Sequence, residues 1–111
     1  MNEQVKEYVS KYSDDIIALF MKLRQIIMDS ASAAPEETLW AKLPSYYVGE
    51  AFVRLIPFKD HINIEASAIL PHRDEISGYK LTPKGMLQIR SSDEIPEEFL
   101  RTVFAETLAQ Q

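Results

Sequence analysis

The chain has 111 residues, 46% of them hydrophobic, which suits one domain with its own core. It lacks cysteine, so disulfides, thiolate catalysis and cysteine-bound zinc are excluded. A net charge of -5 argues against general nucleic-acid binding, and no apolar run approaches the length of a membrane span. We therefore expect a cytoplasmic protein with one domain over residues 1–111 and with neither nucleic acid nor a membrane as partner.

Two helices are expected at the start of the chain. Val5, Tyr8, Val9 and Tyr12 recur at helical spacing and predict a short first helix. Ser13 then offers an N-cap side chain for a second helix. The apolar face of that second helix consists of Ile16, Leu19, Phe20, Leu23, Ile26 and Ile27.

From residue 37 the hydrophobic period changes towards two, and β-branched and aromatic side chains become frequent. A strand is expected at 38–43, interrupted by Pro44. Further strands are expected at 45–48, 51–58 and 61–66. Gly49-Glu50 separates the first two of these and favours a type II′ turn, while Lys59-Asp60 forms the next tight turn.

The rest of the chain contains a short helix, one more hairpin and a last helix. Residues 71–77 predict two helical turns that end at Gly78. Strands at 79–81 and 86–90 flank a turn at 82–85, and the last helix begins at Pro96. The buried stripe of that helix is expected to be Phe99, Leu100, Val103, Phe104 and Leu108. This order predicts an α+β fold: an antiparallel sheet of about five strands with the N-terminal and C-terminal helices packed on one face.

The Lys59-Asp60 turn also predicts which side chains share a face of the sheet. Facing residues have numbers that sum to 119, which places Arg54 opposite Glu65 and Phe58 opposite His61. The alternate positions are aliphatic and should lie under the helices: Val53, Leu55, Ile62, Ile64 and Ala66. The other face then carries Phe52, Arg54, Phe58, His61 and Glu65.

This mixed face has two interpretations. Arg54 and Glu65 form either an exposed cross-strand ion pair, which contributes a few tenths of a kcal/mol, or part of a recognition surface. A recognition surface there would bind a protein, a small ligand or a second copy of the chain. Trp40 and Tyr46, which flank Pro44, either fill the core or line a pocket. Lys84 belongs to a basic group around the last hairpin, which either protects a sheet edge or attracts an anion.

No arrangement typical of catalysis is visible. The three glycines are explained by turns and a helix end, and no serine lies in a nucleophile elbow. His61 and Glu65 would be roughly 13 Å apart on one strand, too far to share a metal ion. His72 and Glu75 could contact one metal, although an exposed polar turn explains them as well. An enzyme is not expected.

Four segments together resemble the YdhG-like family, a group of small bacterial domains of unknown function. These are ETLWAKLPSY at 37–46, FKDHI at 58–62, YKLTPKGMLQI at 79–89 and IP at 95–96. The resemblance covers residues 16–108. The matching positions are Trp40, Pro44, Tyr46, Phe58, Lys59, His61, Lys84 and Gly85.

The resemblance implies an α+β fold with helices on one side of an antiparallel sheet. Some members are described as frataxin-like iron chaperones, which implies a ridge of carboxylates that binds iron. In this chain the carboxylates available for such a ridge are Glu3, Glu7, Asp14 and Asp15. Two hypotheses follow: a binding or adaptor domain that uses the uncovered sheet face, and an iron chaperone. A third, an enzyme, would require a pocket that contains His61 or His72.

Overall fold

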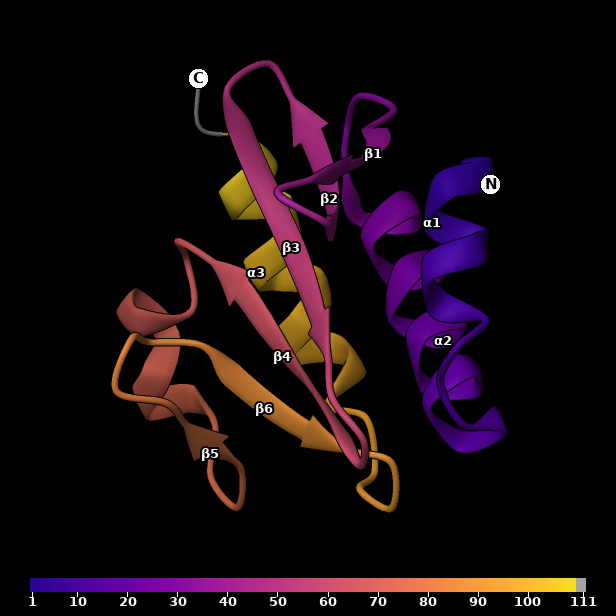
Figure 1. Ribbon diagram of the computed structural model, residues 1–111. Helices are drawn as coiled ribbons and strands as arrows, with labels where there is room; N and C mark the ends of the chain where they lie inside the picture. Colours follow the sequence, from indigo (N-terminus) through magenta and orange to yellow (C-terminus); the bar gives the residue numbers. More distant parts are fainter. Residues whose placement is uncertain (110–111) are drawn as a thin grey trace.

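Helices cover one face of an antiparallel sheet in the computed structural model, which describes residues 1–109 (Figure 1). The helices are α1 (Glu3–Val9), α2 (Asp14–Ser30) and α3 (Glu97–Ala109), with a 3-10 helix, η1 (Leu70–Glu75). The strands are β1 (Glu36–Trp40), β2 (Leu43–Val48), β3 (Ala51–Pro57), β4 (His61–Ala66), β5 (Lys80–Leu81) and β6 (Leu87–Arg90). The predicted α+β class is confirmed, with six strands in the sheet instead of about five.

Side-chain caps fix where the first two helices begin. The Asn2 side chain accepts hydrogen bonds from the backbone at the start of α1, and the Ser13 hydroxyl accepts one from Ile16 at the start of α2. The six apolar residues predicted for the second helix are all buried. The first helix ends at Val9, because Ser10 already acts as its C-cap, so Tyr12 lies beyond it.

The strand order is β1-β2-β3-β4-β6-β5, and every neighbouring pair is antiparallel. The predicted register of β3 and β4 is confirmed, with Arg54 opposite Glu65. A type II′ turn has a positive φ at its first central residue only. The turn between β2 and β3 fits this pattern, because Gly49 has a φ of 61° and Glu50 does not have a positive φ. In Figure 1 α3 passes behind β3, so the opposite face of the sheet is the uncovered one.

The predicted strand at 38–43 is wrong. The chain turns back after Trp40, and Leu43 begins a new strand that contains Pro44. Ala41 and Lys42 make this turn with φ values of 49° and 66°, a conformation usually reserved for Asn-Gly or Gly-Gly. Because neither residue signals such a turn, the sequence pattern did not reveal the first hairpin.

The short helix and the last hairpin form the left side of the molecule in Figure 1. The predicted helical segment is a 3-10 helix that begins at Leu70. Gly85 closes the turn before β6, with its N–H donating to the Thr82 carbonyl at 2.9 Å. Gly85 has a φ of 84°, a conformation that favours glycine, and a Cβ there would lie 2.8 Å from Leu70 Cδ1, so the Leu70 side chain would have to shift.

The covered face carries the hydrophobic core. Val53, Leu55, Ile62 and Ile64 are fully buried there, as the predicted alternation requires. In α3 the predicted stripe is buried except for the half-buried Phe99, and Thr107 is buried in addition. Within residues 1–109, none of the helices has the length and apolar character needed to cross a lipid bilayer.

A polar network centred on Glu37 also lies on the covered face. Its carboxylate accepts two hydrogen bonds from Arg24, one from the Tyr46 hydroxyl at 2.7 Å and one from the Asn2 backbone at 2.7 Å. Burial alone would raise the pKa of Glu37, but these donors outweigh it and lower the pKa below its ordinary value. The Asn2 side-chain amide also donates to the Glu37 carbonyl, which ties the start of α1 to β1, the outermost strand.

Candidate functional site

The uncovered face of the sheet is centred on the side chain of Arg54. Its guanidinium carbon lies 4.2 Å from the centre of the Trp40 ring and 4.0 Å from that of the Phe52 ring. Both distances are typical of cation–π contacts. Trp40 itself remains 53% exposed, so a large aromatic surface faces outward above the arginine.

Hydrogen bonds fix the edges of the same guanidinium. Nε donates to the Ser45 hydroxyl at 2.8 Å, and the two terminal nitrogens donate to the Tyr47 hydroxyl at 2.8 Å and to Glu65 Oε1 at 3.1 Å. The cross-strand ion pair with Glu65 that one interpretation expected is present, but only 7% of the Arg54 side chain is exposed, so Arg54 is not at the surface. The Trp40 and Phe52 rings remove the arginine from water. We call this group, Trp40, Ser45, Tyr47, Phe52, Arg54 and Glu65, the Arg54 cluster.

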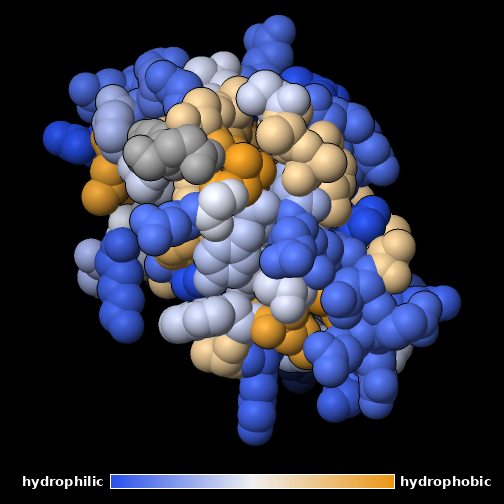
Figure 2. Space-filling view, turned by 90° about the horizontal axis from the view of Figure 1, so that it is seen from above, coloured by the Kyte–Doolittle hydropathy of each residue, from blue (hydrophilic) through white to orange (hydrophobic). Residues whose placement is uncertain are grey.

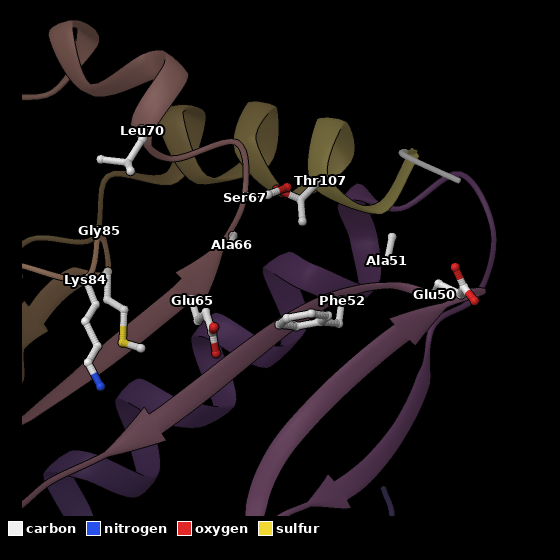
Figure 3. A pocket seen from close by; sticks show the side chains of 11 residues that line it. Glu50, Ala51, Phe52, Glu65, Ala66, Ser67, Leu70, Lys84, Gly85 and Thr107 are labelled. Carbon is white, nitrogen blue, oxygen red and sulfur yellow. The ribbon is translucent and has the colours of Figure 1, made fainter.

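A pocket of about 470 Å³ lies beside the Arg54 cluster (Figure 3). Phe52 and Glu65 belong to both. The other lining residues come from the β2–β3 turn, the end of β4, η1, the turn before β6 and α3: Glu50, Ala51, Ala66, Ser67, Leu70, Lys84, Gly85, Met86 and Thr107. The volume is within the range of small-molecule sites, and most of the lining surface is apolar, as such sites require.

Three charged side chains surround this pocket. Glu65 extends from β4 beside the Phe52 ring, Glu50 lies at the β2–β3 turn, and Lys84 extends from the turn before β6 (Figure 3). Glu65 is held by Arg54, whereas Glu50 and Lys84 form no ion pair within residues 1–109. The pocket therefore combines apolar walls with charges of both signs.

The structure does not bring all of the sequence-predicted site residues together. Tyr46 is fully buried on the covered face and donates to Glu37, so it does not form a pocket with Trp40, which lies on the other face. Paired residues on neighbouring strands point to the same face of the sheet. Tyr46 pairs with Val53, which faces the core, so Tyr46 faces the core as well.

Phe58 and His61 lie on the uncovered face, at the far end of the β3–β4 hairpin. Their rings stack with centres 4.6 Å apart and planes at 15°. The hydrogen bond from His61 lowers the pKa of Asp60 in the turn between them. Four residues of strand, roughly 13 Å, separate this pair from Arg54 and Glu65. It is therefore a second feature of the face and not part of the pocket.

The predicted set of site residues does not include Ser45, Tyr47, Leu70 or Met86. The first two could have been found, because the Gly49-Glu50 turn places Ser45 opposite Arg54 and Tyr47 opposite Phe52. Leu70 and Met86 had no such signal. They reach the pocket only because η1 packs against the turn at Gly85.

Within residues 1–109, no group of three or more histidine, aspartate or glutamate side chains is arranged to hold a metal ion. Glu3, Glu7, Asp14 and Asp15, the carboxylates considered for iron, therefore do not form such a group. His72 is instead held between Glu75 and Glu106, one carboxylate at each ring nitrogen, which joins η1 to α3. The hydrogen bond that His72 donates to Glu75, followed by the one it donates to Glu106, raises the pKa of His72.

The surface near the β2–β3 hairpin is otherwise mixed in character. Figure 2, seen from that end of the molecule, shows small hydrophobic areas separated by hydrophilic residues.

Comparison with protein-family models, curated proteins and solved structures finds no match to this chain. The YdhG-like resemblance therefore stays a prediction.

Proposed function

We propose that this chain is a binding domain that takes a small ligand in the pocket beside the Arg54 cluster. The supporting observation is that the pocket borders side chains whose positions are already fixed. Arg54 holds Phe52 by stacking and Glu65 by a hydrogen bond, and both line the pocket. A site whose walls are fixed before binding loses less conformational entropy when a ligand enters.

A small ligand accounts for this geometry better than a flat protein contact. The pocket is concave and mainly apolar, and it has few charged groups. Leu70, which is 44% exposed, forms an outer wall that a ligand would cover. A protein partner or a second copy of the chain would instead cover Trp40 and Phe58 as well, because both are exposed on the same face.

A fragment screen by two-dimensional NMR tests this function. Fragments should shift the amide signals of Phe52, Leu70 and Met86, and the variant Leu70→Glu should weaken these shifts by placing a charge in the apolar wall. Met21→Glu is the matched control, since Met21 is a similarly exposed hydrophobic residue (41%) on α2 that does not line the pocket.

The same screen distinguishes a small ligand in the pocket from a second copy of the chain on the uncovered face. If the shifts centre on Trp40 and Phe58 and grow with protein concentration alone, the face joins two copies of the chain. Trp40 is the only tryptophan in the sequence, so its fluorescence reports directly on this contact. Either that result, or a complete library that shifts none of the pocket signals, would overturn the proposed function.

A further inference from the structure

Given the proposed ligand-binding function, on which this step depends, we infer that the pocket selects a small zwitterion with an aliphatic body. An apolar amino acid is the simplest molecule of this class. Three features of the pocket support the inference: a fixed carboxylate, a free ammonium group and apolar walls beside them.

The fixed carboxylate is that of Glu65. Its Oε1 accepts a hydrogen bond from Arg54, and Arg54 in turn donates hydrogen bonds to Ser45 and Tyr47. These bonds fix the orientation of the Glu65 carboxylate. Within residues 1–109 no hydrogen bond to Oε2 is formed, and 36% of the side chain is exposed. One carboxylate oxygen is therefore available to a ligand ammonium group, and Glu50 adds a second negative charge at the same pocket.

The free ammonium group is that of Lys84. It is the third residue of the turn that the Gly85 N–H closes, so its backbone is fixed while its side chain extends along the pocket (Figure 3). Lys84 forms no ion pair within the described part of the chain, and it does not pair with Glu65 although both line the same pocket. A ligand carboxylate would give it a partner.

The pocket walls beside these two charges are apolar. Phe52, Leu70 and Met86 are the large apolar residues of the lining, and Figure 3 shows Phe52 beside Glu65, on the side away from Lys84. An aliphatic chain buried there is stabilised by removal of its surface from water. A ligand with a single charge would lose the attraction of either Glu65 or Lys84, which lowers its affinity relative to a zwitterion.

Matched probes test the choice of a zwitterion. The labelled protein is titrated with L-leucine, with isoamylamine, which lacks the carboxylate, with 4-methylpentanoate, which lacks the ammonium group, and with the neutral 3-methylbutan-1-ol. The set of 6-aminohexanoate, hexylamine and hexanoate repeats the test at a longer charge separation. We expect at least one zwitterion to bind about tenfold more tightly than its singly charged analogues, the effect of one charged hydrogen bond.

Two variants assign the charges to residues. Lys84→Gln should remove the preference for the zwitterion over the amine, and Lys80→Gln, an exposed lysine on β5 that does not line the pocket, should keep it. Glu65→Gln should remove the preference over the carboxylate. Glu36→Gln, on an exposed residue of β1, is its control.

Failure of this inference and failure of the proposed function give different results. If singly charged or neutral probes bind as tightly as the zwitterions and shift Leu70 and Met86, the pocket binds ligands but the zwitterion assignment is wrong. If none of the seven probes shifts those signals, the zwitterion assignment is wrong as well. The fragment screen described above then decides whether the pocket binds any ligand.

Discussion

Two networks on opposite faces of the sheet each join an arginine, a glutamate and a tyrosine, and the two tyrosines are neighbours in the chain. On the covered face Glu37 is the centre, and four hydrogen bonds converge on its carboxylate. On the uncovered face Arg54 is the centre, and Glu65 at its edge has an oxygen without a partner among residues 1–109. The first network is closed and the second is open, which suggests a structural role for one and a binding role for the other.

Replacing the central carboxylate should have the largest effect on folding. Glu37→Gln leaves Arg24 without its counter-charge in a site where the glutamate side chain is only 6% exposed. We expect a loss of about 3 kcal/mol in the free energy of unfolding, measured by urea denaturation at pH 7. The exposed neighbour Glu36→Gln should change this free energy by less than about 0.5 kcal/mol. Equal effects of the two would show that the closed network does not stabilise the fold.

The same carboxylate gives the fold a pH dependence. Because its pKa is lower in the folded protein than in the unfolded chain, the stability from Glu37 is present above the unfolded pKa and is lost as the pH falls through the folded pKa. Glu37→Gln should therefore flatten the loss of stability in acid, measured by urea denaturation between pH 5 and about pH 2.

A substitution in the open network around Arg54 should lower the free energy of unfolding by less than Glu37→Gln does. Arg54→Lys keeps the positive charge but loses the planar group that stacks between Trp40 and Phe52 and bonds Ser45 and Tyr47. We expect a loss of about 2 kcal/mol in urea denaturation, together with a changed Trp40 emission spectrum in the folded state. Arg101→Lys, at an exposed pair on α3, is the control and should leave both unchanged. An unchanged Trp40 spectrum in Arg54→Lys would contradict the stacked arrangement.

The turn that carries Trp40 allows a gain in stability. Ala41 and Lys42 both have positive φ, which costs about 1 kcal/mol per residue for side chains of this kind. Asn-Gly at these positions should raise the free energy of unfolding by about 1 kcal/mol, measured in the same way. Glu50→Gly, in the next hairpin, should give no gain because Glu50 does not have a positive φ. A loss of stability in the Asn-Gly variant would show that the turn is held by side-chain contacts instead.

The smallest effect is expected at His72, whose pH dependence is opposite to that of Glu37. Its pKa is raised by Glu75 and Glu106, so the stability from this contact is present below the unfolded pKa and is lost as the pH rises through the folded pKa. An NMR titration of the imidazole should show the raised pKa, and Glu106→Gln should lower it. Glu98→Gln, an exposed glutamate on the same helix, should leave it unchanged. Equal shifts from both variants would rule out the bridge to Glu106.

Strand alternation was enough to predict the sheet faces but not the site. The aliphatic residues of β3 and β4 identified the covered face, and the Lys59-Asp60 turn gave the pairing of Arg54 with Glu65. The Ala41-Lys42 turn could not be predicted, because its positive φ values are imposed by the surrounding hairpin and not by the residue types. The burial of Arg54 could not be predicted either, because it depends on the same turn. The chain turns back directly after Trp40, and this places the Trp40 ring over the guanidinium.

The contact between Asn2 and the outermost strand has a consequence for self-association. An unoccupied strand edge is a template on which further molecules can add, and sheets that offer one tend to polymerise. Here the side-chain amide of Asn2 already occupies the Glu37 carbonyl, and the opposite edge is a strand of only two residues that begins with a lysine. A strand that added to β1 at Glu37 would first have to break this contact with Asn2.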